Sequence, residues 1–172
     1  MLRITELAPA GATARDGLSL PFELRRRSRL RTRLESGAEA ALFLPRGLVL
    51  KEGDLLRAED GAVIRVRAAP ETVSRARTAD AHLLVRAAYH LGNRHVALQV
   101  GPGELRYPHD HVLDDMVRAL GLTVTAEQLP FEPEAGAYGG HGHSHEPGHG
   151  HSHGHEDDGD HHGLEHGHGH EH

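Results

Sequence analysis

The chain has 172 residues, a formal net charge of −6 and no cysteine, which excludes disulfides, cysteine-type zinc sites and iron–sulfur clusters. No apolar run is long enough for a transmembrane helix, and the N-terminal residues lack the apolar centre of a secretory signal. We therefore expect a cytoplasmic protein with no membrane partner. Aromatic residues make up only 3% of the chain, which argues against a surface that stacks nucleic-acid bases.

The first 70 residues are predicted to form an all-β domain. Turn signals spaced about 8–12 residues apart, without a helical period, are typical of such a unit. In residues 29–34, leucine alternates with polar side chains, as in a strand with one buried face. Asp60-Gly61 suits a hairpin turn, and residues 68–70 mark the expected boundary. The predicted strands cover residues 29–34, 40–44, 48–50 and 62–67.

Residues 71–138 are predicted to alternate strands and helices. The predicted strands are 71–77, 95–100, 104–107 and 122–129. A helix over 81–91 is expected to begin at a cap, Thr78 or Asp80, and a second runs from a cap at Asp110 to Leu120. The inward-facing residues of the second helix are predicted to be Val112, Leu113, Met116, Val117 and Leu120. The order β-α-β-β-α-β is that of a ferredoxin-like unit, so the expected fold class is α+β.

Residues 139–172 differ from the rest of the chain. They hold 13 of the 18 histidines and seven acidic residues, but no lysine or arginine. Because this segment has almost no apolar area to offset its conformational entropy, we predict a disordered tail. Residues 1–138 contain 19 basic and 18 acidic residues, so the negative charge belongs to the tail.

The tail repeats the pattern His-x-His, with glycine or serine between the imidazoles. Neutral imidazole binds Ni²⁺, Cu²⁺ and Zn²⁺, and a flexible chain can turn several rings towards one ion. This favours capture of several kinds of ion rather than catalysis. An expression tag is usually an unbroken histidine run, and an acidic solubilising tail would not need thirteen imidazoles. The candidate ligands are His141, His143, His145, His149, His151, His153, His155, His161, His162, His166, His168, His170 and His172.

Three histidines outside the tail are further candidate ligands. His109 and His111 repeat the His-x-His spacing at the start of the second helix, where they either chelate one ion or are solvated helix-start residues. His95 opens a predicted strand. A single histidine makes a weak site, but a twofold axis would duplicate it.

Four segments precede the tail: residues 89–95 (YHLGNRH), 102–105 (PGEL), 109–116 (HDHVLDDM) and 130–138 (PFEPEAGAY). In this order they closely resemble the UreE family, urease accessory proteins that act as nickel metallochaperones. The close match spans about residues 86–138. Residues 1–70 match more loosely, through 29–31 (RLR), 44–47 (LPRG) and 53–54 (GD).

The resemblance implies an N-terminal domain (1–70) that engages partners and a metal-binding domain (71–138) that forms a homodimer. It implies that His95 is the interface ligand, with both copies meeting one ion, and that His109 and His111 match a pair found in some members. The cargo would be Ni²⁺, with Zn²⁺ and Cu²⁺ also bound in vitro. Transfer would proceed to a urease accessory GTPase and the urease apoprotein complex. Our hypothesis is that the tail collects ions and loads the His95 pair.

Three other functions compete with delivery. A metal-dependent hydrolase lacks support because the sequence has no phosphate loop, and its matches to His-Glu-x-x-His and Gly-x-Ser-x-Gly, residues 145–149 (HEPGH) and 150–154 (GHSHG), lie in the tail rather than on a predicted helix or strand-to-helix turn. We therefore expect no enzyme activity. Six arginines between residues 25 and 33 could contact phosphate, but residues 1–138 carry only a net charge of +1, so no nucleic-acid partner is expected. A passive store of nickel, zinc or copper, acting through the tail alone, is the alternative that deletion of residues 139–172 would test.

Overall fold

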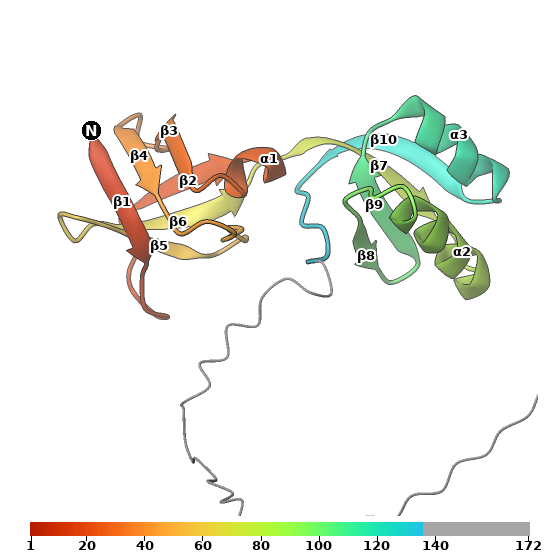
Figure 1. The fold of residues 1–172 in the computed structure, drawn as a ribbon, viewed down its shortest axis with the longest axis horizontal. Helices are drawn as coiled ribbons and strands as arrows, with labels where there is room; N and C mark the ends of the chain where they lie inside the picture. The colour runs from red at the N-terminus through yellow and green to blue at the C-terminus, as the bar shows by residue number, and fades with distance from the viewer. Residues whose placement is uncertain (136–172) are drawn as a thin grey trace, which may run out of the picture. The chain divides into compact units, whose positions relative to one another are not determined.

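The computed structural model describes residues 1–135, and these form two β-sheets (Figure 1). The first sheet contains β1 (Leu2–Leu7), β2 (Asp16–Leu20), β3 (Arg29–Arg33), β4 (Glu39–Phe43), β5 (Leu55–Ala58) and β6 (Val63–Ala68). The second contains β7 (Glu71–Arg77), β8 (Gln99–Gly101), β9 (Glu104–Pro108) and β10 (Thr123–Leu129). The helices are α1 (Phe22–Arg25), α2 (Ala81–Gly92) and α3 (His111–Ala119). The predicted disordered tail and its thirteen histidines lie outside the described residues.

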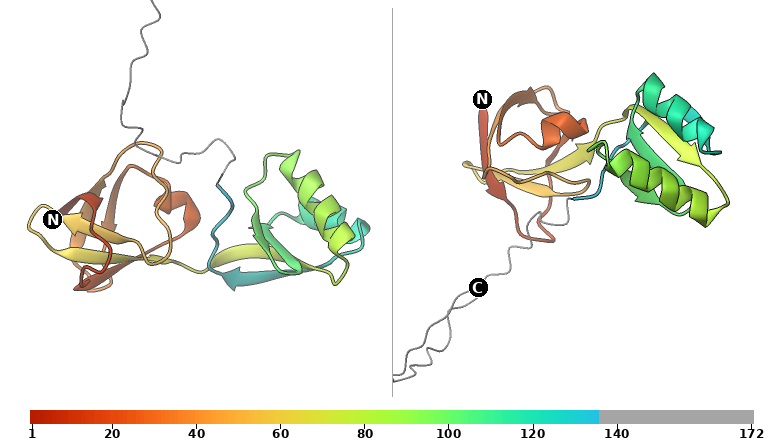
Figure 2. Two further views of the ribbon diagram at one scale, coloured as in Figure 1. Left: turned by 90° about the horizontal axis from the view of Figure 1, so that it is seen from below. Right: turned by 45° about the vertical axis from the view of Figure 1, so that its right-hand side comes forward.

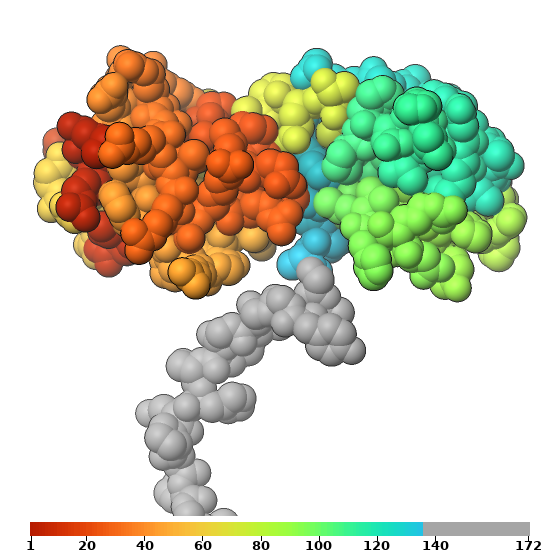
Figure 3. Space-filling view, turned by 45° about the horizontal axis from the view of Figure 1, so that its top comes forward, coloured from red at the N-terminus to blue at the C-terminus, as the bar shows by residue number. Residues whose placement is uncertain are grey.

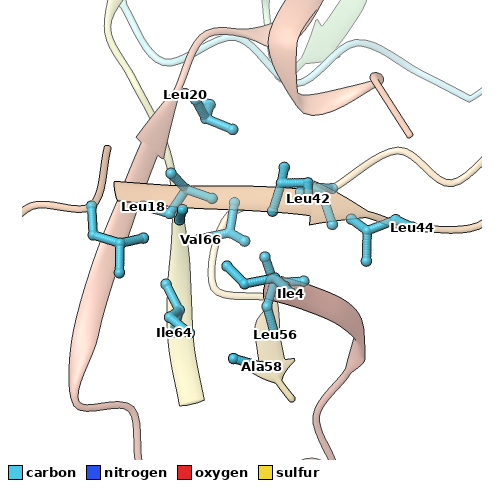
Figure 4. Close-up of a cluster of buried hydrophobic side chains, with 12 residues drawn as sticks. Ile4, Leu18, Leu20, Leu42, Leu44, Leu56, Ala58, Ile64 and Val66 are labelled. Carbon is cyan, nitrogen blue, oxygen red and sulfur yellow. The ribbon is translucent and has the colours of Figure 1, made fainter. Parts of the chain in front are cut away.

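The first sheet has the strand order β2-β6-β5-β1-β4-β3. The pairs β1–β4 and β2–β6 are parallel, and the other neighbours are antiparallel. Its apolar side chains converge on one core, in which Ile4, Leu18 and Val66 are fully buried (Figure 4). The predicted hairpin turn at Asp60-Gly61 is confirmed: it joins β5 to β6, and Gly61 takes φ +84°, which glycine adopts without steric cost.

Two expectations for this part of the chain were wrong. Residues 48–50 form no strand, because the backbone N–H of Leu50 donates to the carbonyl of Arg25 at 3.0 Å instead of joining a ladder. Leu50 is nevertheless fully buried. The part predicted to be all-β also contains α1, which has only four residues and is too short to produce a helical period. The alternation in β3 is confirmed, since its arginines are exposed and Leu30 is half-buried.

The second sheet has the order β10-β7-β9-β8, with every neighbouring pair antiparallel. Both α2 and α3 pack against this sheet, as Figure 2 shows, and their apolar residues share one core with β7, β9 and β10. The observed order of strands and helices is the predicted one. None of the helices among the described residues is long and apolar enough to cross a membrane.

Local capping explains where the two longer helices begin. The carboxylate of Asp80 accepts hydrogen bonds from the backbone N–H groups of His82 and Leu83 at 2.8 and 3.3 Å. The carboxylate of Asp110 does the same for Val112 and Leu113 at 2.8 and 3.0 Å. These bonds satisfy backbone donors that have no partner within the helix. The predicted cap at Asp110 is thus confirmed, and of the two positions predicted for the first helix, Thr78 and Asp80, the cap is Asp80.

The buried face of α3 differs from the predicted one at two positions. Val112 was expected to point inward, but it is 62% exposed. Asp114 is buried instead, with 2% of its surface exposed. A carboxylate is tolerated there because it has polar partners: Tyr107 of β9 donates a hydrogen bond to it, and His109 lies within ion-pair distance.

Candidate metal centre

His95 does not open a strand, as predicted, but lies in the turn that follows α2. The strand β8 begins only at Gln99. His95 is the one residue other than glycine, among residues 1–135, that has a positive φ, at 56°. Its backbone N–H donates to Gly92 O at 2.9 Å, and that of Val96 donates to Leu91 O at 3.4 Å. This pair of hydrogen bonds is a Schellman motif, with His95 at the position that glycine usually takes.

The Schellman motif explains why the chain turns at His95, four residues after the predicted end of the helix at Leu91. Val96 and Leu91 both belong to the core under α2, and their packing determines where the chain leaves the helix. The left-handed conformation costs a non-glycine residue about 1–2 kcal/mol. Strain of this kind persists where the surrounding structure compensates for it, and it is frequent at functional sites. The His95 side chain itself is exposed.

His95 lines an open hollow with a volume of about 730 Å³. The segment that follows β10 forms another wall of this hollow, through Glu132 and Glu134. The backbone N–H of Glu134 donates to Leu98 O at 2.8 Å, and that of Glu132 donates to the side chain of Gln99 at 2.9 Å. The chain that leads towards the histidine-rich tail is therefore attached beside the His95 turn.

A buried arginine holds the same segment from the side of the first sheet. The guanidinium of Arg25 is almost fully buried and donates to the carbonyls of Leu20, Leu50 and Phe131. It also forms an ion pair with Glu132 at 3.3 Å. The rings of Phe22 and Phe131 meet edge to face, with their centroids 5.6 Å apart. These contacts position Glu132, which lines the hollow.

His109 and His111 flank the residue that caps α3. His109 follows β9, and His111 is the first residue of the helix, so the expected placement at the helix start is confirmed. Asp110 stands between these two histidines. The hydrogen bond from the backbone N–H of Leu113 is the main cause that lowers the pKa of Asp110, and the hydrogen bond from the N–H of Val112 lowers it further. This carboxylate therefore stays ionised beside the two imidazoles at neutral pH.

A buried polar cluster lies behind His109, and the sequence analysis missed it. The hydroxyl of Tyr107 donates to Asp114 Oδ1 at 2.9 Å. His109 Nδ1 lies 3.0 Å from Ser74 Oγ and 3.4 Å from Asp114 Oδ2. Burial, together with the hydrogen bond to Asp114, raises the pKa of Tyr107, so its hydroxyl remains a donor. Helical spacing could have revealed Asp114, because it lies three residues before the buried Val117.

The described residues do not by themselves complete a metal site. Among residues 1–135, no group of three or more histidine, aspartate or glutamate side chains is close enough to hold an ion. His95 and the pair His109 and His111 belong to different segments of the chain. A metal bound at His95 therefore requires further ligands, from water, a second chain or the tail.

One face of α2 is apolar and exposed. Val85 and Tyr89 are 66% and 65% exposed, and their spacing of four residues places them on the same side of the helix. Figure 3 shows the light-green atoms of α2 at the surface of the molecule. Tyr89 precedes His95 by six residues, so this face ends close to the His95 turn. Large exposed apolar side chains next to each other are typical of interaction surfaces.

Comparison with known proteins shows the family of the chain. The family described as UreE urease accessory protein, N-terminal domain, matches residues 3–69, and its C-terminal domain counterpart matches residues 71–156. The chain is 57% identical over 140 residues to the urease accessory protein UreE of Alkalilimnicola ehrlichii, covering 81% of this chain and 86% of that one. It is 55% identical over 139 residues to the protein of the same name from Enterobacter sp. (strain 638), covering 80% and 91%. For that of Pseudomonas putida (strain GB-1), the identity is 64% over 122 residues, covering 70% and 74%. The chain therefore belongs to the UreE family of urease accessory proteins.

Proposed function

We propose that this protein binds Ni²⁺ and delivers it for assembly of the urease active site. The observation that carries the proposal is the exposed His95, held in a left-handed turn beside the exposed apolar face of α2. Because the family consists of urease accessory proteins, we propose urease as the recipient of the ion. We further propose that the protein acts in the cytoplasm, with the urease accessory GTPase and the urease apoprotein complex as its partners.

In this proposal, two copies of the chain associate through the second sheet and its helices, residues 71–138. A twofold axis beside Val85 and Tyr89 would bury their apolar surface and bring the two His95 side chains together. Two imidazoles alone leave coordination positions of the ion open to water or an incoming ligand. Such a site can hold the cargo and still exchange it, whereas a site closed by four protein ligands would retain it.

The other candidate ligands act in collection rather than in delivery. We propose that His109, His111 and the tail histidines capture ions and supply them to the His95 pair. The attachment of residues 132–134 beside the His95 turn supports this, because the tail continues from that segment. Residues 1–70 would engage the protein partners, with the exposed arginines of β3 facing an acidic surface.

Calorimetric titration with Ni²⁺ tests the proposal on the chain truncated after Tyr138. The truncation keeps every residue of both hydrophobic cores, so the folded part is retained. We expect the tightest-bound ion to be one per dimer, and to be lost with the substitution His95→Asn, because asparagine tolerates the left-handed conformation but lacks the imidazole. Weaker binding at His109 and His111 should remain in both proteins. His82→Asn, at an exposed histidine on α2, is the matched control and should keep the ion.

The same titration distinguishes delivery from passive storage. A store that acts through its tail would bind no ion after truncation, and this result would contradict the proposed delivery site. Sedimentation of each variant shows whether loss of the ion reflects loss of the ligand or loss of the dimer.

A further inference from the structure

The buried carboxylate of Asp114 faces one nitrogen of the His109 ring. With 2% of its surface exposed, this carboxylate needs polar partners, since an isolated buried charge is strongly unfavourable. Oδ1 accepts the hydroxyl proton of Tyr107 at 2.9 Å. Oδ2 lies 3.4 Å from His109 Nδ1 and 3.7 Å from a guanidinium nitrogen of Arg118. Tyr107 thus donates a hydrogen bond to the carboxylate, and the other two nitrogens lie within ion-pair distance of it.

The arrangement favours the form of His109 in which Nδ1 carries the proton. An ionised carboxylate only accepts hydrogen bonds, so His109 Nδ1 faces it favourably only as N–H. Ser74 Oγ, 3.0 Å from the same nitrogen, is a hydroxyl and can accept that proton as well. The other ring nitrogen, Nε2, is then unprotonated. The His109 side chain is 41% exposed, so this lone pair is accessible to an ion.

We propose that Asp114 is a positioning residue, which holds His109 as the Nδ1–H tautomer so that Nε2 binds the Ni²⁺ cargo. The inference rests on the proposed function and adds to it a residue that does not touch the metal. Histidine ligands commonly donate their second N–H to a carboxylate, which fixes the ring and makes the binding nitrogen more basic. In the described part of the chain, the His111 ring has no such carboxylate partner, so His109 is the preorganised member of the pair.

The tautomer can be measured directly in the intact, metal-free protein. Nitrogen-15 NMR of the histidine rings, recorded at pH 8, should show His109 protonated at Nδ1. In Asp114→Asn, the amide can donate to Nδ1, and the ring should shift towards the Nε2–H form. Asp115→Asn is the matched control, because this neighbouring carboxylate is exposed and pairs with Arg118 at 3.1 Å. It should leave the ring unchanged.

Nickel binding provides the second readout. Paramagnetic Ni²⁺ broadens the signals of a ring that binds it, so a titration of the full chain reports on His109 separately from the tail. The Asp114→Asn variant should need about 10–100-fold more Ni²⁺ to lose the His109 signal, as for other carboxylates that orient a ligand histidine. The tail competes for the ion equally in every variant. The Ni²⁺ concentration needed by Asp114→Asn is therefore compared with that needed by Asp115→Asn.

A purely structural role for Asp114 predicts different results. Tyr107→Phe removes a hydrogen bond from the same carboxylate, and should lower stability while leaving the His109 tautomer unchanged. An Nε2–H ring in the wild-type protein would overturn the inference, even if Asp114→Asn does not fold. An unchanged tautomer and unchanged nickel response in a folded Asp114→Asn protein would overturn it too. Neither result changes the ion expected at the His95 pair. The titration of the truncated chain therefore tests the proposed function independently of this inference.

Discussion

At the scale of single residues, His95 combines an exposed imidazole with a backbone conformation that costs energy. Its φ of 56° is the left-handed conformation in which a side chain crowds the backbone. A glycine at this position would end the helix without strain. Histidine therefore reduces stability here, which is expected of a residue kept for its chemistry.

We predict that His95→Gly raises the free energy of unfolding by up to about 1 kcal/mol, because glycine relieves the left-handed strain. His95→Ala keeps the strain and should give no such gain. Both variants lose the imidazole and should lose the tightest-bound nickel ion of the truncated dimer. Urea unfolding followed by circular dichroism measures the difference. Asn93→Gly, in the same turn but with φ −63°, should instead lower stability, and a similar gain at both positions would contradict the explanation.

At the scale of elements, the two faces of α2 have different partners. One face packs on the second sheet through Ala87 and Leu91, which are fully buried. The other face exposes Val85 and Tyr89 to solvent in the single chain. A helix that is apolar on two sides is usually covered on both in its working assembly. The proposed dimer thus depends on the exposed face of α2.

We predict that Val85→Lys and Tyr89→Lys each weaken dimerisation more than tenfold, because a lysine charge would lose its hydration at the contact. Sedimentation equilibrium over a range of protein concentrations measures the effect. Both positions are exposed, so the monomer should keep the circular dichroism spectrum of the wild type. The control is Leu7→Lys, at an exposed apolar residue of β1. An unchanged dimer in both α2 variants would place the contact elsewhere.

At the scale of the whole molecule, charged side chains join segments that are distant in the sequence. Arg25 links the first sheet to Phe131 and Glu132. In the second sheet, Arg75 and Arg106 lie opposite each other on β7 and β9, where like charges repel. Glu104 accepts a hydrogen bond from each, at 2.6 and 2.9 Å, and so compensates for this repulsion.

The acid stability of the protein should depend on Glu104. Burial opposes its ionisation, but the hydrogen bonds and charges of Arg75 and Arg106 outweigh burial and lower the pKa of this carboxyl from 4.5. A pKa that is lower in the folded state stabilises the protein above the unfolded value, and this stabilisation is lost as the pH falls through the folded pKa. Glu104→Gln should therefore cost about 2 kcal/mol at pH 7, and the difference from wild type should narrow below about pH 4.5.

Urea unfolding between pH 3 and pH 7, at constant protein concentration, measures this dependence. Glu59→Gln removes a carboxylate from an exposed pair with Arg3, and should change stability by less than about 1 kcal/mol throughout. A difference between wild type and Glu104→Gln that stays constant with pH would show that the charge of Glu104 does not stabilise the fold.

The sequence by itself determined the features that depend on neighbouring residues. Caps at Asp80 and Asp110, the hairpin turn at Gly61 and the order of strands and helices follow from short-range hydrogen bonds and apolar periodicity. The His-x-His pattern likewise indicated metal binding, because chelation by neighbouring imidazoles depends on their spacing in the sequence. Only the tertiary structure placed His95 in a left-handed turn and Asp114 in a buried cluster. Both depend on partners from other segments: the core that fixes the end of α2, and Tyr107 and His109, which contact the buried carboxylate. Helical spacing can indicate that position 114 faces inward, but only the packed chain brings these partners to it.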